Sequence, residues 1–326
     1  MTLKPAAATI GELLSWGRPH GSEIERRWVH TFIYPYAPNV DGFGNRWVRI
    51  GDAPILWSCH TDTMAASEGE QRLVVQEGIL KLAKGKAGMC LGADDGAGCW
   101  LLIEMIEAKI PGLYVFHRGE ERGGLGSDWI RKNNKKMLDG IEFAIAFDRK
   151  GKEDVITHQM VGRTASDDAA LQIATILGGK YFPSNTGTFT DTANYADIVP
   201  ECTNISVGYE REHGPTESLD LAHLFSLRKT VLTADWSQLK AHRKPGDFEV
   251  PDWPEDDWAR YDSYYTPKKR AYSNFDLDFE EEFIELVQNY PEVAVQIMRG
   301  EGWTTQDFLD AINRDRVYYD KEDLQQ

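Results

Sequence analysis

YVFHRGEERGGLGS, residues 114–127, is the stretch from which the organisation of the chain can be worked out. With Leu113 before it, its first part is an apolar run short enough for a buried β-strand. Its second part is rich in glycine, which permits tight turns and a close approach of the backbone to a ligand. The stretch therefore predicts a buried strand that ends in a turn, and the turn carries two adjacent acidic residues, Glu120 and Glu121.

The two glutamates can be interpreted in two ways. Neighbouring carboxylates at the end of a buried strand repel each other, and both stay charged only when a cation holds them. A bound metal supplies that cation: one glutamate would bind it, and the other would take a proton from the water that the metal activates. The alternative is a pair of solvated glutamates in a surface loop, and the motif alone does not exclude it.

The charge of the chain limits its function. Its 326 residues carry a formal net charge of −16, so the phosphates of nucleic acid would be repelled and we exclude nucleic acid as a partner. The charge is concentrated towards the C-terminus, because from Gly246 onward there are 21 acidic and 8 basic residues, a difference of 13. The part before Gly246 is nearly neutral and has the apolar content of a globular protein.

The four cysteines, Cys59, Cys90, Cys99 and Cys202, form no Cys-x-x-Cys pair, so their spacing indicates neither a zinc finger nor a redox motif. Three of them have apolar neighbours, and we expect buried, reduced thiols. The N-terminus has no signal-peptide pattern, and no apolar run is long enough to cross a membrane. A cytoplasmic protein without a membrane partner is therefore expected.

Two further predicted strands end in polar residues. Residues 54–59 are apolar and are followed by His60 and Asp62, and residues 141–147 are followed by Asp148. In open α/β sheets, ligands bind outside the carboxyl ends of the strands, so these side chains are expected at one edge of the sheet. An imidazole there can bind a metal while a carboxylate orients its ring. A single His-x-Asp pair is also compatible with a surface loop.

Two loops add candidate ligands. Asp94 and Asp95 lie in a Gly-rich loop before an apolar helix predicted over residues 100–108. An aspartate there can bind a metal or, more simply, only cap the helix. His213 follows a strand predicted over residues 204–209. The other predicted elements are helices over residues 23–34, 128–135, 169–177 and 219–242, a strand over 46–50, a hairpin over 72–82 and a loop over 188–194.

Together these loops offer two imidazoles and three carboxylates, a donor set that zinc accepts. The five residues are His60, Asp94, Glu121, Asp148 and His213. A catalytic zinc ion usually has three protein ligands and a water, so five ligands are too many for one ion. They suit two ions about 3.5–4 Å apart that share one bridging carboxylate.

The order and the residues of these motifs resemble those of the di-zinc exopeptidases, in particular the co-catalytic zinc aminopeptidases and tripeptidases. The resemblance covers most of residues 8–243 and rests on five motifs in the family's order. They are HTDT at 60–63, LGADDGAG at 91–98, EERG at 120–123, FD at 147–148, and CTNISVGY at 202–209 with the histidine at 213. The resemblance implies a three-layer α/β/α sandwich with a mixed, mostly parallel central sheet, the phosphorylase/hydrolase-like zinc peptidase fold.

The resemblance also implies a role for each motif. Its metal ligands are His60 and Asp148 for one ion, Glu121 and His213 for the other, and Asp94 for both. Asp62 would hydrogen-bond His60, and Glu120 would act as general base and then general acid. In this family the peptide bond between residues such as Asp94 and Asp95 is often cis. Two divalent ions are expected, Zn²⁺ before Co²⁺ or Mn²⁺.

Two other residues are candidates for contacts with substrate. Tyr209 can present its hydroxyl to the tetrahedral intermediate, or it can pack against a neighbouring strand. Asp191 follows a turn near the expected cleft, where it can support the site. His117 lies on the strand before Glu120 and is expected to be a packed residue rather than a ligand.

The implied reaction is metal-dependent hydrolysis of peptide bonds, with removal of N-terminal residues from a peptide substrate by a metal-bridged hydroxide. An aspartate at position 148, where many carboxypeptidase and deacylase relatives have glutamate, favours an aminopeptidase. One alternative is a di-metal deacylase or carboxypeptidase acting on N-acyl amino acids or peptides. The other is a catalytically silent binding or assembly protein that uses its acidic tail. The intact ligand set and the presence of Glu120 argue against this second alternative.

The lengths of two segments complete the prediction. Only 65 positions separate Asp148 from His213, too few for the rest of the sheet and a lid domain, so a lidless form is expected. Residues 1–245 would form the catalytic domain, and 246–326 an acidic linker with a small helical C-terminal extension, with helices over 279–288, 291–299 and 304–313. Aromatic residues of the linker, among them Trp253 and Trp258, suggest that it contacts the catalytic domain, a second subunit of a homo-oligomer or a protein partner.

Overall fold

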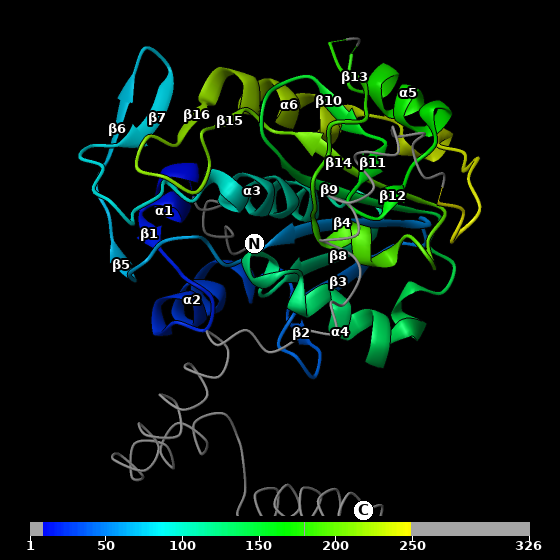
Figure 1. Ribbon diagram of the computed structural model, residues 1–326, viewed down its shortest axis with the longest axis horizontal. Helices are drawn as coiled ribbons and strands as arrows, with labels where there is room; N and C mark the ends of the chain where they lie inside the picture. Colours follow the sequence, from blue (N-terminus) through cyan, green and yellow to red (C-terminus); the bar gives the residue numbers. More distant parts are fainter. Residues whose placement is uncertain (1–8, 179, 249–326) are drawn as a thin grey trace, which may run out of the picture. The chain divides into compact units, whose positions relative to one another are not determined.

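An eight-stranded sheet runs through the structure, a computed structural model that describes residues 9–178 and 180–248 (Figure 1). Its strands, in spatial order, are β13 (Phe182–Ser184), β10 (Asp154–Ile156), β14 (Glu201–Ser206), β9 (Phe143–Arg149), β4 (Ile55–His60), β8 (Gly112–His117), β3 (Arg46–Ile50) and β2 (Asn39–Val40). The four central strands, β14, β9, β4 and β8, are parallel. Antiparallel pairs flank them, β10 with β14 on one side and β3 with β8 on the other. The predicted mixed, mostly parallel sheet is confirmed.

The central strands are buried on both faces, as their nearly continuous apolar sequences predict. Every residue of β4 and β8 is buried. Alternate side chains point to opposite faces of the sheet. Trp57 and Tyr114, which are partners in the register of β4 and β8, therefore lie in one hydrophobic cluster, and their neighbours Leu56 and Leu113 lie in a second cluster.

Helices cover both faces of the sheet, which makes three layers. The first cluster includes side chains of α1 (Ile10–Leu14), α3 (Ala93–Glu107), α5 (Asp167–Ile176) and α6 (Leu221–Thr233). The second cluster includes Ile130 of α4 (Leu125–Asn133) and Tyr195 of the 3-10 helix Asp191–Tyr195. Figure 1 shows α3 and α6 on one side of the sheet and α4 on the other. The predicted α/β/α sandwich is confirmed.

A second, antiparallel sheet contains β15 (Tyr209–Glu210), β16 (Ser218–Asp220), β7 (Ile79–Leu82) and β6 (Leu73–Gln76) in that order. Its β6–β7 pair is the predicted hairpin. Two short pairs join β1 (Trp16–Gly17) to β5 (Gly69–Glu70) and β11 (His158–Gln159) to β12 (Gly162–Arg163). The second sheet matters for the site, because the turn between β15 and β16 carries His213.

Several predicted boundaries are wrong. The strand predicted over 204–209 is interrupted at Gly208, whose φ of +101° turns the chain from the main sheet into β15 of the second sheet. The helix predicted over 219–242 ends at Thr233, because Asp235 then caps a separate 3-10 helix, Trp236–Gln238. The helix predicted over 23–34 is divided into α2 (Glu23–Trp28) and a π-helix, Val29–Ile33.

The other differences are smaller. The helix predicted over 100–108 begins earlier, at Ala93, and the loop predicted over 188–194 contains the 3-10 helix at Asp191. The strand predicted over 46–50 matches β3, and a further 3-10 helix, Lys135–Leu138, follows α4. All four cysteines are buried and unpaired, as expected.

The described residues between Asp148 and His213 form strands of the two larger sheets, the β11–β12 pair, α5, the 3-10 helix Asp191–Tyr195 and short connections. None of them builds a separate lid domain. None of the helices within residues 9–178 and 180–248 has the length and apolar character that a membrane crossing requires. The helices predicted at 279–288, 291–299 and 304–313, and the aromatic residues of the linker, lie outside the described residues.

The last described residues still contact the body of the protein. Gly246 donates its backbone N–H to the carbonyl of Ala196 at 2.9 Å. The Arg243 guanidinium lies 5.3 Å from the centre of the Phe248 ring, which packs against the second hydrophobic cluster. A truncation that keeps these contacts has to end after Phe248 rather than at Pro245.

Candidate metal centre

Three parallel strands deliver acidic or imidazole side chains to the same edge of the main sheet. His60 ends β4, and Asp148 is the penultimate residue of β9. Glu120 and Glu121 lie on the 3-10 helix Glu120–Arg122, which follows β8. The glycines on either side of this helix, Gly119 and Gly123, have φ values of +75° and +86°, which explains why the turn needs glycine. The predicted meeting of strand ends is observed.

One group of ligand atoms is formed by His60, Asp94 and Asp148. Nε2 of His60 is 3.0 Å from Oδ1 of Asp94 and 3.5 Å from Oδ1 of Asp148. All three residues are buried, and their ligand atoms lie within 4.8 Å of one another. This spacing allows one cation to contact all three.

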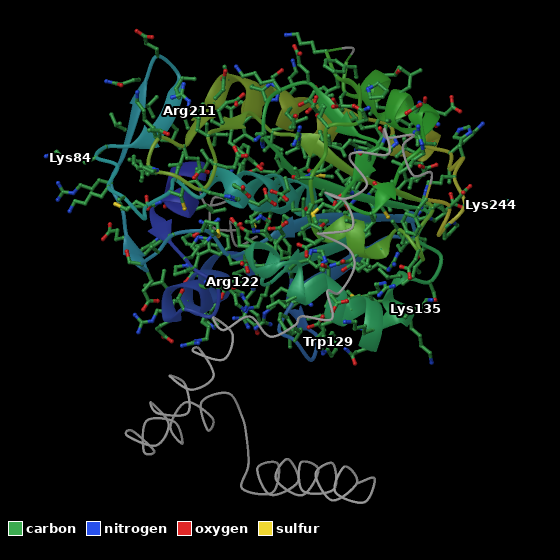
Figure 2. All side chains as sticks on the ribbon, viewed as in Figure 1. Lys84, Arg122, Trp129, Lys135, Arg211 and Lys244 are labelled. Atoms are coloured by element: carbon green, nitrogen blue, oxygen red, sulfur yellow. The ribbon has the colours of Figure 1, made fainter. Side chains whose placement is uncertain are left out.

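A second group contains Asp94, Glu121 and His213. Nε2 of His213 is 3.1 Å from Oδ2 of Asp94 and 3.1 Å from Oε2 of Glu121. Asp94 therefore belongs to both groups, with one carboxylate oxygen in each. The loop of His213 is on the surface, and 45% of its side chain is exposed. In Figure 2, Arg122 and Arg211 are labelled on the two loops that supply Glu121 and His213.

The charges in the site call for a cation. Burial opposes protonation of His60, but Asp148, Asp62 and Asp94 outweigh it and raise the pKa of His60 well above its ordinary value. Hydrogen bonds to Asp94 and Glu121 raise the pKa of His213 to about 11. The crowded carboxylates are thus compensated by protons on the two imidazoles, which a divalent metal would displace.

The donor atoms also fit a metal. Imidazole nitrogens and carboxylate oxygens are ligands of zinc and similar ions. Oε1 of Glu121 is buried and has no hydrogen-bond partner, although an unpaired buried carboxylate oxygen is costly. A cation bound by the Glu121 carboxylate would satisfy it. The arrangement is therefore suited to divalent metal.

Glu120 lies at the edge of these groups and belongs to neither. Its Oε2 is 3.9 Å from Nε2 of His60. Burial raises the pKa of Glu120 well above its usual value, and the nearby Asp148 and Asp191 add to the effect. Bound cations would lower it again, because they favour the charged carboxylate. The Glu120 carboxylate thus lies beside both ligand groups without being part of either.

The resemblance pairs Asp62 with His60, and the two residues lie side by side in the structure. Nδ1 of His60 contacts the backbone carbonyl of Asp62 at 3.1 Å, whereas the Asp62 carboxylate is 3.7 Å away. Oδ1 of that carboxylate accepts the N–H groups of Gly119 at 2.9 Å and Glu120 at 3.2 Å. The Asp62 side chain therefore fixes the turn that carries Glu120, and its backbone orients His60.

Asp95 holds the backbone rather than a metal. Its Oδ2 accepts the N–H of His60 at 3.2 Å, and its Oδ1 accepts the N–H of Gly98 at 2.9 Å. The second contact holds the first turn of α3, whose N-cap is Gly92 rather than Asp95. The first contact links the His60 motif to the Asp94 motif. The peptide bond between Asp94 and Asp95 is cis, as the resemblance implies.

Two supporting residues were not identified from the sequence. The Asn204 side chain accepts the N–H of Asp148 at 2.9 Å and donates to its carbonyl at 2.8 Å. The buried Glu217 accepts the N–H of Gly92 at 2.9 Å and that of Asp94 at 3.1 Å. Both residues lie within stretches noted for other reasons, but no spacing rule points to contacts so distant in the chain.

The candidates for substrate contacts differ in position. Tyr209 is buried, and its hydroxyl donates to the backbone carbonyl of Asp148 at 3.1 Å. Asp191 is also buried and accepts a hydrogen bond of 2.5 Å from Ser127, and burial raises its pKa to about 7. Tyr209 borders the cavity described below, and Asp191 is not among the residues that line it.

His117 is packed, as expected. It is buried, its Nε2 lies 2.7 Å from the hydroxyl of Tyr195, and burial lowers its pKa to about 3. A further group of possible ligands, His20, Glu25 and Asp62, is less suited to a metal, because Arg118 already neutralises Glu25 at 3.1 Å.

A cavity of about 140 Å³ opens beside the candidate ligands. Asp94, Asp148, His213 and Glu120 form part of its lining. The remaining lining residues are Arg149, Lys150, Ile156, Gln159, Gly187, Thr188, Phe189, Asn204, Tyr209 and Glu212. A small molecule in this cavity would therefore touch three of the candidate ligands and Glu120 together with charged, polar and apolar residues.

Comparison with solved structures identifies the fold. No protein-family model and no curated protein sequence matches the chain. The structure of aminopeptidase PepT from Bacillus cereus superposes with a TM-score of 0.54 at 14% identity, over 68% of this chain and 95% of that one. A tripeptidase from Staphylococcus aureus superposes with a TM-score of 0.56 at 16% identity, over 69% and 95%.

A third structure is the TET1 peptidase of Pyrococcus horikoshii, with a TM-score of 0.51 at 17% identity, over 66% of this chain and 94% of that one. Identities this low establish the common fold and no more. The chain has the fold of these peptidases, which agrees with the architecture that the motifs implied.

Proposed function

We propose that the protein is a di-metal exopeptidase that removes N-terminal residues from peptides. One observation carries the proposal: the two oxygens of Asp94 belong to two separate ligand groups, and Glu120 lies outside both. Two adjacent metals with a separate carboxylate are what hydrolysis by paired ions requires. The shared fold with an aminopeptidase and a tripeptidase supports the same class of reaction.

The five ligands would divide between two ions, most simply Zn²⁺, with Co²⁺ or Mn²⁺ as alternatives. They are His60 and Asp148 for the first ion, Glu121 and His213 for the second, and Asp94 for both. When bound, such ions activate water and polarise the carbonyl of the scissile bond. The Asp148 carboxylate is held for this purpose by the hydroxyl of Thr190 at 2.7 Å.

Glu120 would serve as the proton carrier. As a carboxylate it accepts a proton from the attacking water, and it then donates that proton to the nitrogen of the leaving amine. Its backbone N–H is fixed by Asp62, so its carboxylate reaches the cavity in a defined direction. Tyr209 would act indirectly, because its hydroxyl contacts Asp148.

The size of the cavity favours a terminal residue as the bound group. Its volume of about 140 Å³ lies well below the roughly 300–1,000 Å³ of pockets that enclose drug-sized ligands. Ile156 and Phe189 offer apolar contacts to a side chain of that residue. The aspartate at position 148, where many carboxypeptidase and deacylase relatives have glutamate, supports an aminopeptidase over the deacylase or carboxypeptidase alternative.

We expect hydrolysis of amino-acid p-nitroanilides that have a free amine and little hydrolysis of their N-acetylated counterparts. The measurement compares kcat/KM for matched pairs of substrates, together with elemental analysis of the purified protein. Chelation should abolish the activity, and Zn²⁺ or Co²⁺ should restore it. Preference for the N-acetylated substrates would favour a deacylase, and metal-free protein without turnover would favour the silent binding protein.

The segment after the described residues is proposed to act in assembly rather than in catalysis. The candidate ligands and Glu120 all lie between His60 and His213, whereas most of the net charge follows Gly246. The TET1 peptidase of Pyrococcus horikoshii can assemble into a tetrahedron or an octahedral shell, so a homo-oligomer is a reasonable expectation for this chain.

A chain that ends at Phe248 is expected to fold and to bind as much metal as the full chain, because the removed segment contains none of the ligands. Its oligomer size or melting temperature should fall, because the removed segment is proposed to act in assembly. Size-exclusion chromatography with light scattering, metal analysis and thermal melting of both chains test this. A truncated protein that is folded but free of metal would show that the C-terminal segment contributes to the site.

A further inference from the structure

Arg18 is a buried cation that the proposed reaction does not use. It follows β1, and its exposed fraction is 0%. Its guanidinium lies 4.4 Å from the centre of the Trp28 ring, over the ring face. Among the described residues, no carboxylate forms an ion pair with it, and its bonds go to backbone carbonyls. Burial of a charge without a counter-charge is costly, so the position calls for an explanation.

The hydrogen bonds of Arg18 join two of the loops that carry candidate ligands. Its Nε donates to the carbonyl of Thr61 at 2.7 Å, and Thr61 directly follows His60. Its Nη2 donates to the carbonyl of Gly92 at 3.1 Å, two residues before Asp94. One rigid, planar group thus links the His60 loop to the Asp94 loop, in addition to the bond from His60 to Asp95.

The Asp94 loop packs closely against Arg18 and its neighbours. Gly92 has a φ of +72°, and a Cβ atom there would lie 2.9 Å from Cγ2 of Thr63 and 3.0 Å from Nη1 of Arg18. A Cβ atom at Gly96 would first meet Cδ2 of Leu14 and would lie 3.0 Å from Nη2 of Arg18. Glycine at these two positions therefore leaves room for several side chains, of which the Arg18 guanidinium is one.

Glu217 binds the same loop through groups of the opposite kind, the backbone N–H groups. The Glu217 carboxylate accepts the N–H of Gly92 and of Asp94, while Arg18 donates to the carbonyl of Gly92. A cation therefore holds a carbonyl, and an anion holds the amides, on the same short segment. Charge-assisted hydrogen bonds of this kind are stronger than neutral ones and fix the backbone more firmly.

We propose that Arg18 is a positioning residue for the metal centre, which it acts on by fixing the distance between His60 and Asp94. The proposal rests on the proposed function, because it presumes that these residues bind metal. Arg18 belongs to neither ligand group and does not line the cavity. Residues that orient metal ligands from outside typically change the metal affinity about 10–100-fold when they are replaced.

The test uses the full chain and two substitutions, Arg18→Met and Arg18→Lys. Apoprotein is titrated with Zn²⁺ by calorimetry and with Co²⁺ by its visible absorption, which reports the ligand geometry. We expect Arg18→Met to bind both metals about 10–100-fold more weakly than the wild type. Arg18→Lys keeps the charge but cannot donate to Thr61 and Gly92 in the same fork, so its Co²⁺ spectrum should also change.

Arg243 provides a matched control. Its exposed fraction is 8%, it donates to the carbonyls of Pro200, Ala196 and Asp247, and it lies against the Phe248 ring. It therefore makes the same kind of contacts as Arg18 but joins no loop that carries a ligand. Arg243→Met should lower the melting temperature and leave the metal affinity within about twofold of the wild type.

The outcomes separate the two proposals. If the wild type binds two ions and both Arg18 variants bind them equally tightly with an unchanged Co²⁺ spectrum, the positioning role is wrong and the proposed function stands. If Arg243→Met weakens metal binding as much as Arg18→Met does, the effect is general destabilisation and the positioning role is again wrong. If the wild type binds no metal, the proposed function fails, and the role of Arg18 fails with it. Should Arg18→Met not fold, as judged by circular dichroism, Arg18→Lys alone decides.

Discussion

Glu120→Gln is expected to bind metal as the wild type does and to lose turnover by about 10²–10⁴-fold, the range that a positioned general base contributes. The substitution keeps the size of the side chain and removes the group that accepts the proton. Because Glu120 belongs to neither ligand group, its loss should leave the metal content unchanged. Steady-state rates and elemental analysis of the same preparation measure both quantities.

The neighbouring glutamate is the matched control for this result. Oε2 of Glu121 lies 3.1 Å from Nε2 of His213, so Glu121→Gln removes charge from a ligand group rather than from the proton carrier. This variant should lose metal affinity and activity together. A Glu120→Gln protein with a near-normal rate would show that another group is the base.

Asp94→Ala is expected to lose both ions, and its activity should fall to that of the chelated wild type. Its two oxygens contribute one to each ligand group, so a single substitution opens both sites. His60→Ala or His213→Ala removes a ligand from one group only and should lose less metal. Equilibrium dialysis against buffered Zn²⁺, followed by elemental analysis, compares the three variants.

The contrast among these variants is the decisive part of the experiment. Asp95, whose carboxylate accepts the N–H groups of Gly98 and His60, is the appropriate control beside Asp94. Asp95→Asn should keep more metal than Asp94→Ala. If Asp94→Ala still binds two ions tightly, Asp94 is not a bridging ligand and the paired site has to be abandoned.

The fold could be predicted from the sequence to the extent that it depends on local pattern. The apolar runs that become β4, β8 and β9 have the length and burial of parallel strands, and each is found within two residues of its predicted bounds. The positions at which strands and helices end were harder to predict. The strand that contains Ser206 gives way at Gly208 to a different sheet, and that change depends on β16 and β7, which are distant in sequence.

The candidate ligands were predictable for a related reason. His60 and Asp148 directly follow or end buried strands, and parallel strands bring their carboxyl ends to one edge. The supporting contacts follow no such rule. Glu217 binds the amide of Gly92 across 125 positions of the chain, and only the folded structure shows that they meet.

The support around the site is made almost entirely through the backbone. Arg18, Asp62, Asp95, Asn204 and Glu217 all bond to peptide N–H or C=O groups at or near the ligands. A peptide group is the same whatever side chain it carries, so the position of a loop and the chemistry it presents are encoded by different residues. Each can then change in evolution without the other. A metal ligand can be exchanged on a loop that stays in place. A supporting residue can be replaced by any side chain that forms a hydrogen bond with the same peptide group. Such independence is one way in which chains of only 14–17% identity can form the same fold.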